Sequence, residues 1–124
     1  MKDFPHLPDA ELEVMQIIWD KGGGVSRQDV ERELSARRSL APTTILTFLT
    51  RLCEKGFLRA EREGRSNLYS PLISRRDYLA RESRSILDKL FGGSLSSFAL
   101  SLSDAGLSRA ELEELRELLE RDEL

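Results

Sequence analysis

The chain has 124 residues, of which 33% are charged, and a formal net charge of -3. This length allows one ordinary domain or two small ones, and a small domain often needs a second copy to bury enough apolar surface. No apolar run reaches the roughly 18 to 20 residues of a membrane-spanning helix, and the N-terminus lacks the apolar segment of a signal peptide. With one cysteine and one histidine, we expect a cytoplasmic protein without a disulfide, a metal site or a cofactor.

Three short helices are predicted within residues 9–55. Apolar residues recur at helical spacing after Asp9, and the glycines at 22–24 end the first helix. Ser26 and Asp29 have the spacing of a capping box, which begins the second helix.

The third helix leads into a predicted hairpin. Pro42 suits the first turn of this helix, and Gly56 stands where a left-handed cap is expected. Apolar and polar residues then alternate on both sides of the turn sequence EGRSN, which is typical of a β-hairpin. Helix, helix, helix and hairpin is the order of a winged helix-turn-helix domain, which we assign to residues 7–72 of a mainly α chain.

Residues 73–124 predict a small helical domain. One helix covers residues 74–91, a short apolar helix follows at 95–103, and a capping box at Ser108 and Glu111 opens a last helix. About 50 residues form too small a core for so many apolar side chains, so we expect them to be buried against a second copy. The residues expected to form this homodimer are Leu79, Ile86, Leu90, Phe91, Phe98, Leu102, Leu112, Leu115 and Leu119.

Charge is distributed unevenly along the chain. Residues 37–65 hold seven arginines and lysines against three glutamates, whereas residues 104–124 hold eight acidic side chains against three arginines. This polarity favours a basic surface for a polyanion and an acidic C-terminal end with another role.

All four threonines lie in the third predicted helix. Threonine is a poor helix former because its branched Cβ restricts the side chain, so this concentration needs a reason. At about 100° per residue, Thr43, Thr47, Thr50, Arg51 and Glu54 share one face opposite the apolar face, with Thr44 at its edge and Glu54 near the helix end, where we expect it to lie beyond the groove. Short hydroxyl side chains let a helix lie close to the floor of the DNA major groove. The pattern therefore predicts a DNA-binding face.

The predicted hairpin carries three arginines beside this helix, Arg59, Arg62 and Arg65. We expect them to contact backbone phosphates or the minor groove, with Arg65 at the turn as the clearest candidate. Paired carboxylates, a nucleophile with its base and a phosphate-binding loop are all missing from the sequence, so we expect no enzymatic activity.

The chain resembles the penicillinase-repressor family, which includes methicillin-resistance and copper-responsive repressors of bacteria. The resemblance rests on ELEVMQIIWDKG, TTILTFLTRLCEKGFL and GRSNLYSPL, and on LFGG followed by LSRAELEELRELL. It implies an N-terminal winged-helix DNA-binding domain, a C-terminal dimerisation domain, and repression of resistance or transporter genes through a palindromic operator. By position, the family's base and phosphate contacts fall on Thr43, Thr44, Leu46, Thr47 and Arg51.

The resemblance also suggests how repression could end. In several members, a pathway with a membrane-bound sensor metalloprotease leads to cleavage of an Asn-Phe bond, which aligns with Leu100 and Ser101 although the residue types differ. Copper-responsive members end in a cysteine-rich metal motif, which this chain lacks.

We therefore expect a homodimeric repressor of transcription, and two alternatives remain open. The first is a winged-helix regulator whose C-terminal half binds a small effector that changes operator affinity. The second is a winged-helix protein-interaction module without DNA binding, for which duplex DNA would bind weakly and with little response to salt.

Overall fold

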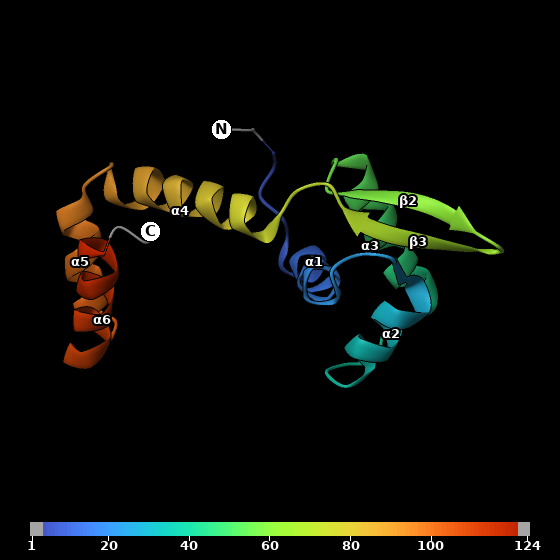
Figure 1. Ribbon diagram of the computed structural model, residues 1–124, viewed down its shortest axis with the longest axis horizontal. Helices are drawn as coiled ribbons and strands as arrows, with labels where there is room; N and C mark the ends of the chain where they lie inside the picture. The colour runs from blue at the N-terminus through green and yellow to red at the C-terminus, as the bar shows by residue number, and fades with distance from the viewer. Residues whose placement is uncertain (1–3, 122–124) are drawn as a thin grey trace. The chain divides into compact units, whose positions relative to one another are not determined.

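The computed structural model describes residues 4–121, apart from the side chain of Leu119. The chain forms two compact units, divided between Glu82 and Ser83. The elements in chain order are α1 (Asp9–Lys21), β1 (Val25–Ser26), α2 (Arg27–Ser35), α3 (Pro42–Glu54), β2 (Leu58–Glu63), β3 (Ser66–Pro71), α4 (Arg75–Phe91), α5 (Leu95–Asp104) and α6 (Arg109–Glu120), as Figure 1 shows.

Local sequence signals set the ends of several helices. Gly22 ends α1 with a φ of 84°, a left-handed conformation that glycine adopts without a steric penalty. The Ser26 hydroxyl accepts the Asp29 N–H while the Asp29 carboxylate accepts the Ser26 N–H, so the predicted capping box of α2 is confirmed. The same reciprocal bonds join Ser108 and Glu111 at the start of α6.

The strands form an antiparallel sheet in the order β1-β3-β2. The predicted hairpin is β2 and β3, in which Ala60 pairs with Tyr69. The sequence analysis did not predict β1, whose Val25 pairs with Tyr69 from the other side. A strand of two residues between a glycine turn and a helix cap is too short to show an alternating pattern.

One apolar core holds the first unit together. Helix α3 packs against α1, α2 and β2, and α1 also contacts β3. The buried residues of the helices and strands in this core are Val14, Met15, Ile17, Ile18, Val25, Val30, Leu34, Ile45, Leu49, Leu52, Leu58, Tyr69 and Tyr78. Three helices and a hairpin around one core form a winged helix-turn-helix domain, as predicted.

The first turn of α4 belongs to this core. Tyr78 is 2% exposed, its hydroxyl accepts the Leu7 N–H at 2.9 Å, and its ring stacks on Phe4 with centroids 6.0 Å apart. Burial raises the pKa of the Tyr78 hydroxyl, which stays protonated at neutral pH. The compact unit consequently extends to Glu82, past residue 72, where the sequence suggested the boundary.

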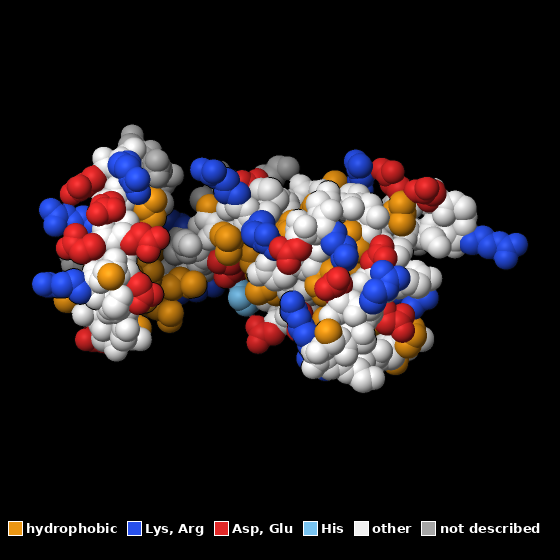
Figure 2. All heavy atoms as spheres, turned by 60° about the horizontal axis from the view of Figure 1, so that its bottom comes forward, with side chains coloured by type: hydrophobic (Ala, Val, Ile, Leu, Met, Phe, Trp, Pro, Cys, Tyr) orange, Lys and Arg blue, Asp and Glu red, His pale blue; other side chains and the backbone are white. Residues whose placement is uncertain are grey.

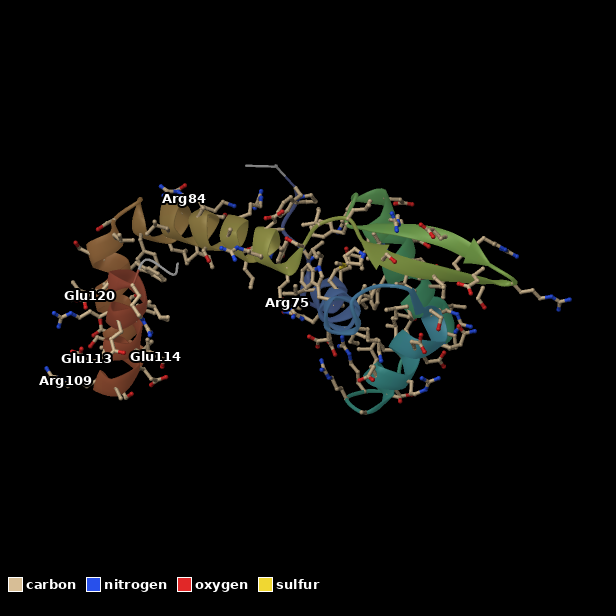
Figure 3. All side chains as sticks on the ribbon, in the orientation of Figure 1. Arg75, Arg84, Arg109, Glu113, Glu114 and Glu120 are labelled. Atoms are coloured by element: carbon tan, nitrogen blue, oxygen red, sulfur yellow. The ribbon has the colours of Figure 1, made fainter. Side chains whose placement is uncertain are left out.

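Arg75 attaches the start of α4 to α1 (Figure 3). Its guanidinium donates to the Gln16 Oε1 at 3.1 Å and to the Asp20 carboxylate at 2.6 Å. It also lies 5.6 Å from the centre of the Trp19 ring, whose Nε1 donates to the Ile73 carbonyl at 2.9 Å. These contacts join the chain on both sides of the hairpin into one unit.

The second unit contains the rest of α4 with α5 and α6. Ser94 caps α5 by accepting the Ser97 N–H. The rings of Phe91 and Phe98 lie 5.2 Å apart, yet no described side chain from residue 83 to 121 is buried. The described part of this unit thus has no closed apolar core of its own.

Among all the residues that the structure describes, 4–121, none of the helices has the length and apolarity needed to cross a membrane.

Candidate nucleic-acid interface

Helix α3 separates its apolar and polar side chains, as the sequence predicted. Pro42 occupies the first turn, where a missing N–H costs nothing. Ile45, Leu49 and Leu52 are buried in the core. The exposed residues on the other side are Thr43, Thr47, Thr50, Arg51 and, at the C-terminal end of the helix, Glu54.

This exposed face is less rich in donors than its residue types suggest. The Thr47 hydroxyl donates to the Thr43 carbonyl at 2.9 Å, so its proton is used within the helix. Thr47 retains a methyl group and an oxygen that can accept, and it has no proton to give to a phosphate in this rotamer. Leu46, to which only the family resemblance pointed, is 44% exposed, and Thr44 is half-buried. The face offers apolar contacts and acceptors, and its donors are the exposed hydroxyls of Thr43 and Thr50 and the long side chain of Arg51.

Two contacts hold the C-terminal end of α3 in place. Gly56 has a φ of 82°, and the Phe57 N–H donates to the Leu52 carbonyl at 2.9 Å, which closes the helix as predicted. The Lys55 ammonium pairs with the carboxylate of Glu11 on α1, whose side chain is 4% exposed. Because a buried carboxylate needs a charged partner, this pair ties α3 to α1 and helps to orient the exposed face.

The β2–β3 hairpin, the wing, lies beside α3 (Figure 1). Its strands are joined by a two-residue turn at Gly64 and Arg65, in which Gly64 has a φ of 62°. Arg65 is exposed at this tip and forms no ion pair within residues 4–121. Arg62 is also exposed, and its Nε donates to the Gly64 carbonyl at 3.3 Å.

Strand alternation separates the charges of the wing. Arg62 and Asn67 pair across the strands and share the face of the buried Tyr69, because side chains two residues apart lie on the same side. Glu61 and Glu63 lie on the opposite face for the same reason. The wing face that continues from the core is therefore polar and basic near the tip, without these two acids.

A shallow hollow of about 180 Å³ lies between α2, α3 and the wing. Its lining includes Arg27 and Gln28 of α2, Leu46 of α3, and Arg65, Ser66 and Asn67 of the wing. The sequence did not predict that Arg27 and Gln28 would line a hollow beside α3, because the expected DNA contacts all lay in the third helix and the hairpin. Their position directly after the Ser26 cap was the only available signal.

The predicted dimerisation residues leave much apolar surface uncovered, and Figure 2 shows hydrophobic side chains at the surface of the second unit. Leu90 is 73% exposed. Leu79, Ile86 and Leu115 are exposed as well, Phe91, Phe98, Leu102 and Leu112 are half-buried, and the side chain of Leu119 lies outside the described residues.

The structure also shows where the aligned cleavage position and the single cysteine lie. Leu100 and Ser101 lie in α5, where Leu100 is exposed and the Ser101 hydroxyl donates to the Phe98 carbonyl at 2.6 Å. Cys53 is half-buried, and its burial, with a smaller contribution from the charge of Glu54, raises the pKa of the thiol. No three His, Cys, Asp or Glu side chains among the described residues are grouped to hold a metal ion.

Sequence comparison places these features among known proteins. A model of the penicillinase repressor family matches residues 7–121. The chain is 41% identical over 121 residues to the penicillinase repressor of Bacillus licheniformis, which covers 97% of this chain and 94% of that protein. It is 33% identical over 116 residues to the methicillin resistance regulatory protein MecI of Mammaliicoccus sciuri, which covers 93% and 94%.

Two solved structures resemble the first unit. The solution structure of the DNA-binding domain of the repressor BlaI has a TM-score of 0.55 and 44% identity, and it covers 63% of this chain and 94% of that one. The monomeric form of Bacillus licheniformis BlaI, solved in complex with the blaP half-operator, has a TM-score of 0.53 at the same identity and coverage.

Proposed function

The chain belongs to the penicillinase repressor family, and on this basis we propose that it is a transcriptional repressor that binds a palindromic DNA operator as a homodimer. The genes under its control are of the resistance or transporter type. The family is one of repressors rather than a class of enzymes, and we propose no catalytic activity for this chain. A repressor acts where its operator lies, so we place it in the cytoplasm.

The face of α3 carries this proposal. Thr43, Thr47 and Thr50 are short and uncharged, so the helix can lie close to the base edges of the major groove. Arg51 adds a side chain that can donate to a base or a phosphate, and Arg65 at the wing tip reaches the neighbouring backbone or minor groove. Thr44, Leu46 and Arg62 complete the proposed contact surface at its edges.

The exposed apolar side chains of the second unit support the homodimer. Isolated exposed leucines are ordinary, but a helical unit without one buried side chain among those described needs a partner surface. A second copy supplies a self-complementary surface around a two-fold axis. The same axis would place two α3 helices on half-sites about 34–36 Å apart for each helical turn of DNA.

The DNA proposal is tested by titration of the protein with duplex DNA from its own promoter region at several salt concentrations. Thr47→Glu/Arg51→Glu places acids on the proposed groove face, and we expect it to abolish specific binding. Ser96→Glu/Arg109→Glu makes the same charge change on exposed residues of the second unit and is the matched control. Equal affinities for wild type and the α3 variant would remove the assignment. Weak binding without a salt response would instead favour the protein-interaction module.

The dimer is tested by sedimentation equilibrium. Leu90→Arg places a charge on the most exposed of the predicted interface leucines whose side chains the structure describes. We expect this variant to be monomeric while its first unit stays folded. It should still bind a half-operator but lose the gain in affinity from two linked half-sites. A wild-type protein that stays monomeric at micromolar concentration would contradict the proposal.

We also propose that a sensor metalloprotease pathway ends repression at the Leu100–Ser101 bond. The exposure of Leu100 supports this position, although α5 has to unwind locally before the bond can enter a protease cleft. Mass spectrometry of the protein from induced cells should find a fragment that ends at Leu100. An intact chain after full induction, or a cut at another bond, would contradict it.

A further inference from the structure

We propose that the hollow between α2, α3 and the wing binds the sugar-phosphate backbone of one operator strand, with Arg27 and Arg65 as its cationic contacts. This inference rests on the proposed DNA binding and extends it to α2. It adds Arg27, Gln28 and Asn67 to the contact surface.

The charge of the hollow suits a phosphodiester. Arg27 and Arg65 line it from α2 and from the wing tip, and no acidic side chain among residues 4–121 lines it. The acids Glu61 and Glu63 lie on the other face of the wing, away from the face of Tyr69, which lines the hollow. A DNA strand here would meet two guanidinium groups, and Arg27 can take a phosphate of its own beside the one at Arg65.

Arg27 forms an ion pair with Glu31 and is still able to bind a phosphate. Its Nη1 donates to the Glu31 carboxylate at 3.0 Å, one turn further along α2. A guanidinium has five N–H donors in a planar fork, so this bond leaves other donors for a phosphate. Because Glu31 already restricts the side chain, less conformational entropy is lost when Arg27 binds.

The remaining lining residues match the rest of a DNA strand. Gln28, Ser66 and Asn67 supply neutral donors, and the exposed side chain of Leu46 supplies an apolar surface. A DNA strand alternates charged phosphates with largely apolar sugars, so a mixed basic and apolar lining fits it better than it fits a free inorganic anion. The hollow lies next to the face of α3 that carries Thr47 and Arg51. The strand that it contacts is therefore the one at the edge of the major groove that α3 enters.

A backbone contact has a different thermodynamic signature from a base contact. Each neutralised phosphate steepens the fall of log affinity with log salt by roughly 0.9, whatever the base sequence. Loss of Arg27 should therefore lower the affinity for the operator and the affinity for an unrelated duplex by the same factor. Loss of a base contact would instead change the ratio of these two affinities.

The first experiment compares Arg27→Gln with Arg32→Gln across a salt series. Arg32 is on the same helix, is exposed and pairs with Asp29 outside the hollow, so its variant removes the same charge from α2. We expect Arg27→Gln to flatten the salt slope by about 0.9 for each hollow, or about 1.8 for a dimer on a full operator. The Arg32→Gln slope should equal that of wild type, and Arg27→Lys, which keeps the charge, should retain most of the slope.

The second experiment replaces operator phosphates one at a time with neutral methylphosphonates. At one position in each half-site, the replacement should weaken DNA binding by the wild type but not by Arg27→Gln. The variant already lacks the ion pair between Arg27 and that phosphate, so removal of the phosphate charge changes nothing further. Absence of such a position, or an Arg27→Gln slope equal to that of wild type, would overturn the inference. If wild type itself fails to bind promoter DNA, the proposed function fails instead, so the two failures are distinct.

Discussion

The buried pair of Glu11 and Lys55 makes a sharp prediction about the stability of the first unit. Lys55→Met removes the cation and leaves the Glu11 carboxylate, whose side chain is 4% exposed, without a charged partner. Loss of one partner of a buried pair typically costs about 3–5 kcal/mol. The Lys55 side chain is 29% exposed, so water can reach part of the site, and we expect the lower end, about 3 kcal/mol.

Urea unfolding followed by Trp19 fluorescence measures this cost. Trp19 is the only tryptophan, and it lies in the first unit, so the signal does not depend on the second unit. With an m-value of roughly 1–2 kcal/mol/M, a loss of about 3 kcal/mol lowers the midpoint by about 1.5–3 M. The far-UV circular dichroism of the variant at zero urea serves as the control for folding.

A double variant separates the loss of the pair from the loss of packing. Glu11→Leu/Lys55→Met replaces both charges with apolar side chains, which is commonly neutral or stabilising when the volumes match. We expect it within about 1 kcal/mol of wild type, so the two single changes should not add. A cost below about 0.5 kcal/mol for Lys55→Met, or a double variant as unstable as the sum of the single ones, would refute the reasoning.

Three further predictions concern local contacts of the first unit. Tyr78→Phe removes the acceptor of the buried Leu7 N–H and should cost about 1–3 kcal/mol in the same urea assay. Ser26→Ala should cost about 1 kcal/mol at neutral pH. The hydrogen bonds from Ser26 hold the pKa of Asp29 below its usual 3.8, so their stabilising effect is complete above pH 3.8 and is lost as the pH falls through the lowered pKa. Thermal melts from pH 7 to 2 should therefore show the cost of Ser26→Ala shrinking. The added Cβ of Gly56→Ala meets no neighbour but is forced into a left-handed conformation, so the free energy of unfolding should fall by about 1–2 kcal/mol. An unchanged urea midpoint would contradict that φ.

Local signals explain most of what the sequence predicted correctly. The capping boxes at Ser26 and Ser108 and the cap at Gly56 depend on a few neighbouring residues, so they can be recognised before any fold is known. The two sides of α3 follow from helical periodicity in the same way. The contact roles of Thr47 and Arg51 stay predictions until DNA binding is measured.

Features that depend on distant parts of the chain were not predicted. Strand β1 forms because β3, more than 40 residues later, supplies its partner, and two residues carry no pattern of their own. Arg27 reaches the hollow only because α2 and the wing fold against each other. The Thr47 hydroxyl bonds its own helix, a choice of rotamer that residue type does not reveal.

The open apolar surface of the second unit has a genetic consequence under the proposed homodimer. Subunit exchange would let a chain with a damaged α3 and an intact second unit pair with a normal chain. Such a mixed dimer would contain only one functional α3 helix, so the defective allele would act dominantly when both alleles are expressed. Alleles that also carry Leu90→Arg would be recessive, since they could no longer capture a normal copy.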